Sequence, residues 1–149
     1  MDSALYLSRA ENELVLADII MRLSSDAQLQ QRLVSTQKPL TFYSAVISHA
    51  YYCMFYAAKA YLLHCGIQTK PPEEHRKTCR AFARVWKAVN GDPAASTLQQ
   101  WLREERDKRS SSAYHRSAQH NRKPAQASLD RARIFYPCIY ARLHTSDKG

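Results

Sequence analysis

Residues 40–66, LTFYSAVISHAYYCMFYAAKAYLLHCG, form an almost continuously apolar and aromatic stretch that decides the fold. Many of its apolar residues are spaced three or four apart, as on one face of a helix: Tyr43, Ile47, Ala50, Met54, Ala58, Tyr61 and Cys65. Nearly all the other positions are apolar or aromatic as well. A helix without a polar face is stable only when neighbours cover it on several sides. The stretch therefore predicts a central helix, which Gly66 ends.

Four further helices are expected around this central one. Residues 3–23 carry a helical stripe of apolar residues, and residues 71–90 open with two prolines and two glutamates, which suit a helix start. The others are expected at about 94–109 and 124–143, the last with a kink at Pro137. Residues 24–39 are polar and are interpreted as a connection with room for a short helix. The expected fold is thus all-α, an up-and-down bundle of about five helices around a buried central helix.

The composition suits a single domain over residues 1–149. The chain has 149 residues and only 3 glycines, which argues against tight hairpins and phosphate-cradling loops. Its four cysteines contain no C-x2-C pair, and we expect them to be reduced thiols. No apolar run approaches the length of a membrane span and no secretory signal opens the chain, so the expected location is the cytoplasm.

Positive charge is concentrated in the last part of the chain. The net charge is +9, and from Lys108 onward nine Lys and Arg residues face only Asp130 and Asp147, which leaves +7 in the last 42 residues. A one-sided positive field attracts polyanions, of which nucleic acid is the commonest. The alternative is a surface that only keeps the protein in solution, and charge alone does not separate the two.

Four blocks of sequence carry a family resemblance. They are AENELVLADI at residues 10–19, YSAVISHAYYCMFYAAKAYLLHCGI at 43–67, EHRKTCRAF at 74–82 and RSSSAYH at 109–115. In their order and spacing they resemble a HEPN domain, whose central helix carries a Ser, a Tyr-Tyr pair, a Phe and small residues in much this order. The corresponding positions here are Ser48, Tyr51, Tyr52, Phe55, Ala57 and Ala58.

The resemblance implies a small helical bundle that dimerises about a two-fold axis. Many HEPN proteins are metal-independent endoribonucleases marked by an Arg, four to six residues, and a His. Arg109 and His115 match that spacing, although Ser110 stands where Asn, Asp or His often follows the Arg. Other members are toxins paired with nucleotidyltransferase antitoxins, or belong to phage-defence and CRISPR-type systems. No metal and no cofactor is expected, and the implied partners are RNA, a second copy of the chain and a possible antitoxin or nucleotidyltransferase.

Cleavage of RNA without a metal needs a base, an acid and a positive group at the phosphate. Histidine serves as base or acid near neutral pH, and arginine offers forked donors to phosphate oxygens. A two-fold dimer would bring two Arg109 and His115 pairs together and so supply both base and acid. On one regular helix the two residues would point about 240° apart, so we expect the helix to break at Ser110-Ser111-Ser112.

Further residues near this motif are candidates for substrate contact. Ser111, Ser112 and Tyr114 are expected to orient the substrate, and Tyr114 suits stacking on a base. The other expected RNA contacts are Arg116, His120 and Arg122. For all of them the alternative is an exposed polar residue at a helix boundary.

Two other sets of residues have competing interpretations. Arg76, Arg80 and Arg84 are spaced four apart and predict either a stripe that follows phosphates or a solvated face paired with glutamates. His49 and His64 lie on the central helix and are interpreted as hydrogen-bonded core residues.

The leading hypothesis is a metal-independent endoribonuclease acting on single-stranded RNA through a composite dimer site, in a toxin–antitoxin or phage-defence setting. The alternative is a non-catalytic HEPN module that binds RNA, a nucleotide or a protein partner through its basic C-terminal third.

Overall fold

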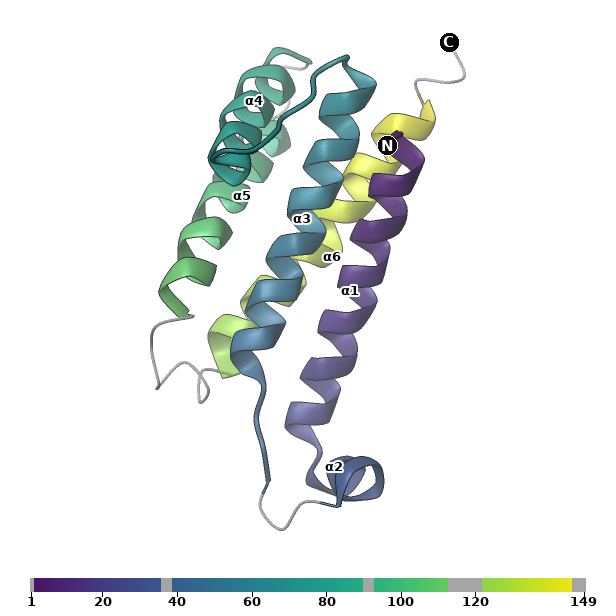
Figure 1. Cartoon of the computed structure of the whole chain (residues 1–149), viewed down its shortest axis with the longest axis vertical. Helices are drawn as coiled ribbons and strands as arrows, with labels where there is room; N and C mark the ends of the chain where they lie inside the picture. Colours follow the sequence, from purple (N-terminus) through teal and green to yellow (C-terminus); the bar gives the residue numbers. More distant parts are fainter. Residues whose placement is uncertain (1, 36–38, 90–92, 113–121, 146–149) are drawn as a thin grey trace.

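The chain folds into a helical bundle (Figure 1). The computed structural model describes residues 2–35, 39–89, 93–112 and 122–145, without the side chains of residues 87–89, 93–96 and 112. These described ranges contain six helices and no strand, which confirms the all-α class. The helices are α1 (Ser3–Ser25), α2 (Ala27–Val34), α3 (Tyr43–His64), α4 (Glu74–Val89), α5 (Pro93–Ser112) and α6 (Arg122–Thr145).

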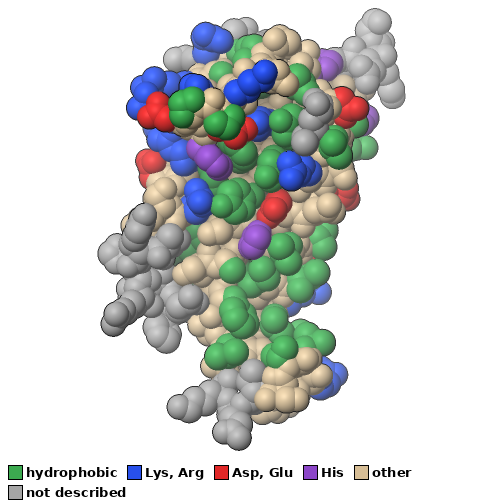
Figure 2. All heavy atoms as spheres, in the orientation of Figure 1, with side chains coloured by type: hydrophobic (Ala, Val, Ile, Leu, Met, Phe, Trp, Pro, Cys, Tyr) green, Lys and Arg blue, Asp and Glu red, His purple; other side chains and the backbone are tan. Residues whose placement is uncertain are grey.

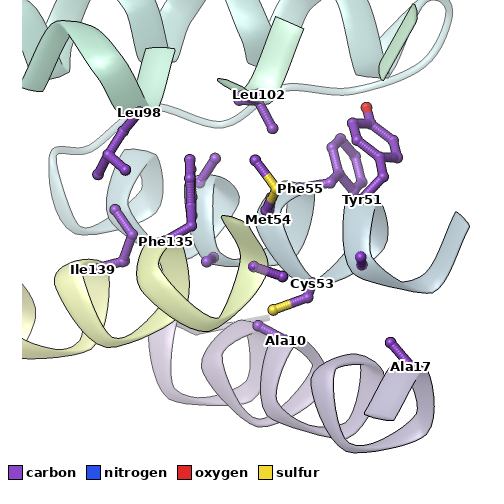
Figure 3. Packing of buried hydrophobic residues seen from close by; sticks show 14 of the residues in the cluster. Ala10, Ala17, Tyr51, Cys53, Met54, Phe55, Leu98, Leu102, Phe135 and Ile139 are labelled. Atoms are coloured by element: carbon purple, nitrogen blue, oxygen red, sulfur yellow. The ribbon is translucent and has the colours of Figure 1, made fainter. Parts of the chain in front are cut away.

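The helix α3 is the central element, as its sequence predicts. It packs against α1, α4, α5 and α6. Four of its alanines have no exposed surface, and their small size lets neighbouring helices approach closely: Ala50, Ala57, Ala58 and Ala60. Figure 3 shows Cys53 of α3 facing Ala10 of α1, while Met54 lies on the side toward α5. One continuous core therefore surrounds α3 on several sides.

The ends of α3 follow simple rules of helix capping. The helix begins at Tyr43, shortly after Pro39, and its last carbonyls are satisfied as the chain turns at Gly66. Gly66 has φ +79°, the left-handed conformation that a glycine adopts without steric cost, as predicted. The next helix, α4, begins at Glu74 and not at the prolines before it, while α6 continues through Pro137 as one helix.

A short helix, α2, occupies half of the connection expected over residues 24–39. The Asp26 side chain accepts a hydrogen bond from the Leu29 amide (3.1 Å) and so caps the helix start. The buried side chain of α2 is Gln30, only 2% exposed, which donates to the Leu23 carbonyl and accepts from the Leu40 amide. Because a polar residue takes the buried position, the sequence pattern allowed this short helix without requiring it, and the structure shows that the helix forms.

The helix α4 runs parallel to α3. His75 near its start lies against Tyr51, and Phe82, two turns later, lies against Tyr61. Residue numbers rise together along the two helices, so the connection over residues 65–73 must return along α3 before α4 begins (Figure 1).

A buried lysine fixes this return. Lys59 of α3 is 7% exposed, donates to the Thr69 carbonyl (3.3 Å) and forms an ion pair with Glu74 at the start of α4. The Thr69 and Thr78 hydroxyls share a further buried hydrogen bond (2.6 Å). These contacts place the first turn of α4 beside the middle of α3.

No helix in the described ranges is long and apolar enough to cross a membrane.

The role of Gln30 gives a test of the fold. We expect Gln30→Ala to lower the free energy of unfolding by about 1–3 kcal/mol, because it removes the side-chain hydrogen bonds that tie α2 to the Leu23 carbonyl and to the Leu40 amide and carbonyl. Chemical denaturation followed by circular dichroism measures the change. Gln28→Ala, at an exposed position of the same helix, is the control. Equal effects of the two substitutions would contradict the assigned role.

Candidate functional site

Arg109 lies at the last turn of α5, facing the central helix. Its guanidinium carbon is 5.0 Å from the centre of the Tyr52 ring and 5.8 Å from that of Tyr51. Both distances are within the range of cation–π attraction, which holds the charged group against α3. A cation at this position also suits the negative end of the α5 dipole. The arginine that the sequence singled out is therefore held in place and is half-buried.

His75 of α4 is built into the same surface. Its ring stacks on Phe55 with a centroid distance of 4.2 Å and an interplanar angle of 19°. Its Nδ1 is 2.8 Å from the Tyr51 hydroxyl, a hydrogen bond between side chains. The stacking and the hydrogen bond together fix the orientation of the imidazole.

Burial and the nearby positive charge keep the His75 imidazole neutral. Burial lowers the pKa of His75 below 6.5, and the nearby Arg109 charge lowers it further. Burial also raises the pKa of Tyr51 well above its usual range, so its phenol remains protonated. We therefore assign the hydrogen bond as Tyr51 O–H donating to Nδ1, which leaves the proton of the neutral ring on Nε2.

The Tyr52 ring joins a second histidine to this group. Its centroid is 6.0 Å from the His49 ring and 6.4 Å from the His75 ring. His49 Nδ1 lies 2.6 Å from Glu13 Oε2 of α1. We call Tyr51, Tyr52, His49, His75 and Arg109 the Tyr52 cluster. It gathers two imidazoles, a guanidinium and two phenols from α3, α4 and α5 in one place.

A family model fits most of the chain. The model described as HEPN domain matches residues 33–141, a range that contains the whole Tyr52 cluster. This chain belongs to the HEPN domain family. Searches among curated proteins and solved structures returned no significant match. Glu13, the partner of His49, comes from α1 and precedes the matched range of the HEPN domain.

The HEPN bundle places only some of the predicted site residues. His115, Tyr114, Arg116 and His120 lie outside the described residues. Ser111 is exposed near the end of α5, and Ser112 is the last residue of that helix. Arg122 is exposed as the first residue of α6.

The helix break expected at the three serines is not present. The helix α5 continues through Ser110 and Ser111 to Ser112. Ser110 and Ser111 are exposed, and the weak helix propensity of serine costs only a few tenths of a kcal/mol per residue there.

The prediction that His49 and His64 are hydrogen-bonded core residues holds for His49 and not for His64. His49 is half-buried and hydrogen-bonded to Glu13, as predicted for a core residue. His64 is exposed in the last turn of α3, so the same prediction is wrong for it. Its position at the negative end of the helix dipole accounts for its presence there. In the described residues, no three His, Cys, Asp or Glu side chains are grouped as a metal site would require.

The positive charge of the C-terminal third is less concentrated in the folded structure than the sequence suggests. Arg131 of α6 pairs with Glu104 (2.9 Å), and Arg133 pairs with Asp18 of α1 (2.5 Å). Lys108 pairs with the buried Glu105 (3.3 Å). Acidic residues of α1 and α5 therefore neutralise several of the charges that the sequence count leaves unopposed.

The effect of the Arg109 charge on the His75 imidazole can be tested by titration. We expect Arg109→Gln to raise the pKa of His75 toward 6.5, because a nearby positive charge disfavours the imidazolium form. Nuclear magnetic resonance titration of the ring protons measures this pKa. Arg84→Gln, an exposed position on α4, is the control and should leave the pKa unchanged. A His75 pKa that is the same in both variants would contradict the proximity of Arg109.

Proposed function

We propose that this HEPN protein is a metal-independent endoribonuclease that cuts single-stranded RNA at a composite site between two copies of the chain. The observation that carries the proposal is the placement of Arg109, which is held against Tyr51 and Tyr52 beside a neutral imidazole. Membership of the HEPN family supports the same activity, and so does the position of His115 within the matched range.

In this mechanism Arg109 holds the scissile phosphate through charge-assisted hydrogen bonds. A base removes the proton of the 2′-hydroxyl, and the 2′-oxygen attacks the phosphorus. The bond to the 5′-oxygen breaks, an acid protonates that oxygen, and a 2′,3′-cyclic phosphate remains. His115 takes one of the two roles and the partner's copy takes the other. Ser111, Ser112 and Tyr114 orient the substrate, and Arg116, His120 and Arg122 contact the RNA beside it.

The Tyr52 cluster offers other imidazoles for the same chemistry. His75 is a neutral imidazole at pH 7 with Nδ1 hydrogen-bonded to Tyr51, and His49 is oriented by the Glu13 carboxylate. A single chain therefore holds two imidazoles near Arg109 in addition to His115. Substitution of each separates their contributions, which makes the assignment to His115 testable.

The proposed setting is a toxin–antitoxin or phage-defence system in the cytoplasm. RNA and a second copy of the chain are the partners that the mechanism requires. An antitoxin, such as a nucleotidyltransferase, is the further partner that would hold the activity in check.

The alternative function is a HEPN module that binds RNA, a nucleotide or a protein without cutting. A pocket lined by arginines between α4 and α5 favours this alternative, because it offers positive charge away from the Tyr52 cluster. Binding of RNA without cleavage by the wild-type protein would decide for it.

Cleavage is tested with single-stranded RNA in the presence of EDTA. We expect Arg109→Ala and His115→Ala each to lower the cleavage rate about 100-fold or more, because each removes charge stabilisation or proton transfer from the transition state. Fragment ends should carry a 2′,3′-cyclic phosphate. His144→Asn, at an exposed histidine of α6, is the control and should cut at the wild-type rate.

Two outcomes would contradict the assignment. Fragments of equal yield from wild type and both variants would point to a contaminating nuclease. Full activity in His115→Ala together with loss in His75→Gln would move the acid–base role to the Tyr52 cluster. Circular dichroism of each variant confirms that the comparison is between folded proteins.

The proposed dimer has a candidate surface on α1. Val15, Leu16 and Ile19 are exposed apolar residues, with Leu16 on the same side of the helix as Glu13, three positions earlier. We expect Val15→Glu/Ile19→Glu to weaken dimerisation, because charged groups replace apolar contact area. Analytical ultracentrifugation measures the dissociation constant. Leu33→Glu, on the exposed surface of α2, is the control, and an unchanged dimer in the α1 variant would exclude this surface.

A further inference from the structure

A pocket of about 410 Å³ lies between α4 and α5, outside the Tyr52 cluster. Four arginines line it: Arg76 and Arg80 from α4, and Arg103 and Arg106 from α5. Figure 2 shows Lys and Arg side chains gathered over the end of the molecule that these two helices form. The volume is near the lower end of the range for small-molecule pockets, so the space suits one nucleotide-sized group.

The sequence explains why the two helices leave this space. Cys79 and Ala83 face the pocket from α4, and both are small. They follow Arg76 by three and seven positions, so they lie on the same side of the helix as the arginines. On α5 the lining residues Gln99, Arg103 and Arg106 are likewise spaced four and three apart. Small residues thus form the floor, and long basic side chains form the rim.

The rim carries more positive charge than the neighbouring acids neutralise. Arg76 pairs with Glu73 (3.1 Å), and Arg106 pairs with Asp107 (3.4 Å). Arg80 and Arg103 form no ion pair with a described residue. Two positive charges therefore remain, and their mutual repulsion favours an anionic ligand.

A polar group in the wall also requires a partner. The Gln99 side-chain amide Nε2 is buried and has no hydrogen-bond partner among the described residues. A buried donor without an acceptor costs free energy. A ligand oxygen in the pocket would provide the acceptor, so the amide is a second and independent sign that the pocket is built to be filled.

We infer that this pocket binds the terminal phosphate monoester of a nucleotide, either free or at the 5′ end of an RNA. A phosphate monoester carries a charge between about −1.5 and −2 at pH 7, which matches the two unneutralised arginines. A phosphodiester inside an RNA strand carries only one negative charge and matches them less well. Arginine forks are well suited to the oxygens of such a group.

This site does not depend on the proposed RNA cleavage. The pocket uses Arg80, Arg103 and Gln99, whereas cleavage is assigned to Arg109 and His115. Oligonucleotides with 2′-O-methyl groups cannot undergo attack by the 2′-oxygen, so binding to them is measured without cleavage. Failure of one proposal therefore leaves the other intact.

The binding test compares three probes: inorganic phosphate, a nucleoside 5′-monophosphate, and a short 2′-O-methyl oligonucleotide with or without a 5′-phosphate. We expect the wild-type protein to bind the phosphorylated oligonucleotide at least about tenfold more tightly than its 5′-hydroxyl counterpart, because the terminal phosphate accepts charge-assisted hydrogen bonds. Isothermal titration calorimetry measures each affinity. A nucleotide that binds as tightly as the oligonucleotide identifies the free nucleotide as the ligand, and a much tighter oligonucleotide identifies the RNA end.

Matched variants separate the pocket from net charge. Arg80→Gln/Arg103→Gln should abolish the preference for the 5′-phosphate. Arg32→Gln/Arg84→Gln removes the same charge from exposed positions outside the pocket and should keep the preference. An equal loss in both double variants, or no preference in the wild type, would overturn the proposal. Thermal unfolding of both variants shows that each remains folded.

A spectroscopic measurement locates the ligand. Titration with the nucleoside monophosphate should shift the side-chain amide signal of Gln99 in a ¹⁵N nuclear magnetic resonance spectrum. The signal is assigned by its absence in Gln99→Leu. Binding with no change in this signal would place the ligand elsewhere and overturn the assigned site.

Discussion

The need to bury α3 on nearly all its sides governs the rest of the structure. A helix with aromatic and apolar residues around its whole circumference is stable only when other helices cover it. Four helices pack on α3, and its fully buried alanines allow them to approach. The tyrosines then have two functions. Their rings fill the core or its edge, and their hydroxyls and faces remain able to hold polar groups such as His75 and Arg109.

The ion pair between the buried Lys59 and the half-buried Glu74 positions the residues of the site. A buried ion pair adds little net stability, because both groups lose their hydration, but loss of one partner is costly. The pair therefore favours one position of α4 over others. In that position His75 meets Tyr51 and Phe55, and the end of α5 brings Arg109 onto the neighbouring Tyr52. The Tyr52 cluster is thus a consequence of where α4 begins.

The sequence predicted the parts of this arrangement that depend on local pattern. The central position of α3, its end at Gly66 and the helical class follow from periodicity and glycine conformation. The Arg109 motif was identified by spacing, and the blocks that resemble the HEPN family contain Tyr51, Tyr52 and His75. Their mutual contact was not predictable, because it requires the return of the chain along α3, which depends on one lysine. The bounds of α2 within residues 24–39 were left open for a similar reason, since its buried residue is Gln30 and not an apolar one.

The distribution of charge along the sequence also differs from its distribution in the folded structure. The C-terminal segment has the largest excess of basic residues, yet α5 turns its acidic residues toward that segment. Glu104 pairs with Arg131, and Glu105, with no exposed surface, accepts a hydrogen bond from Ser128 (2.7 Å). Because these glutamates face α6, the arginines on the other side of α5 face α4 without equal opposition. The arrangement that neutralises the basic tail is therefore the same one that leaves a positively charged pocket between α4 and α5.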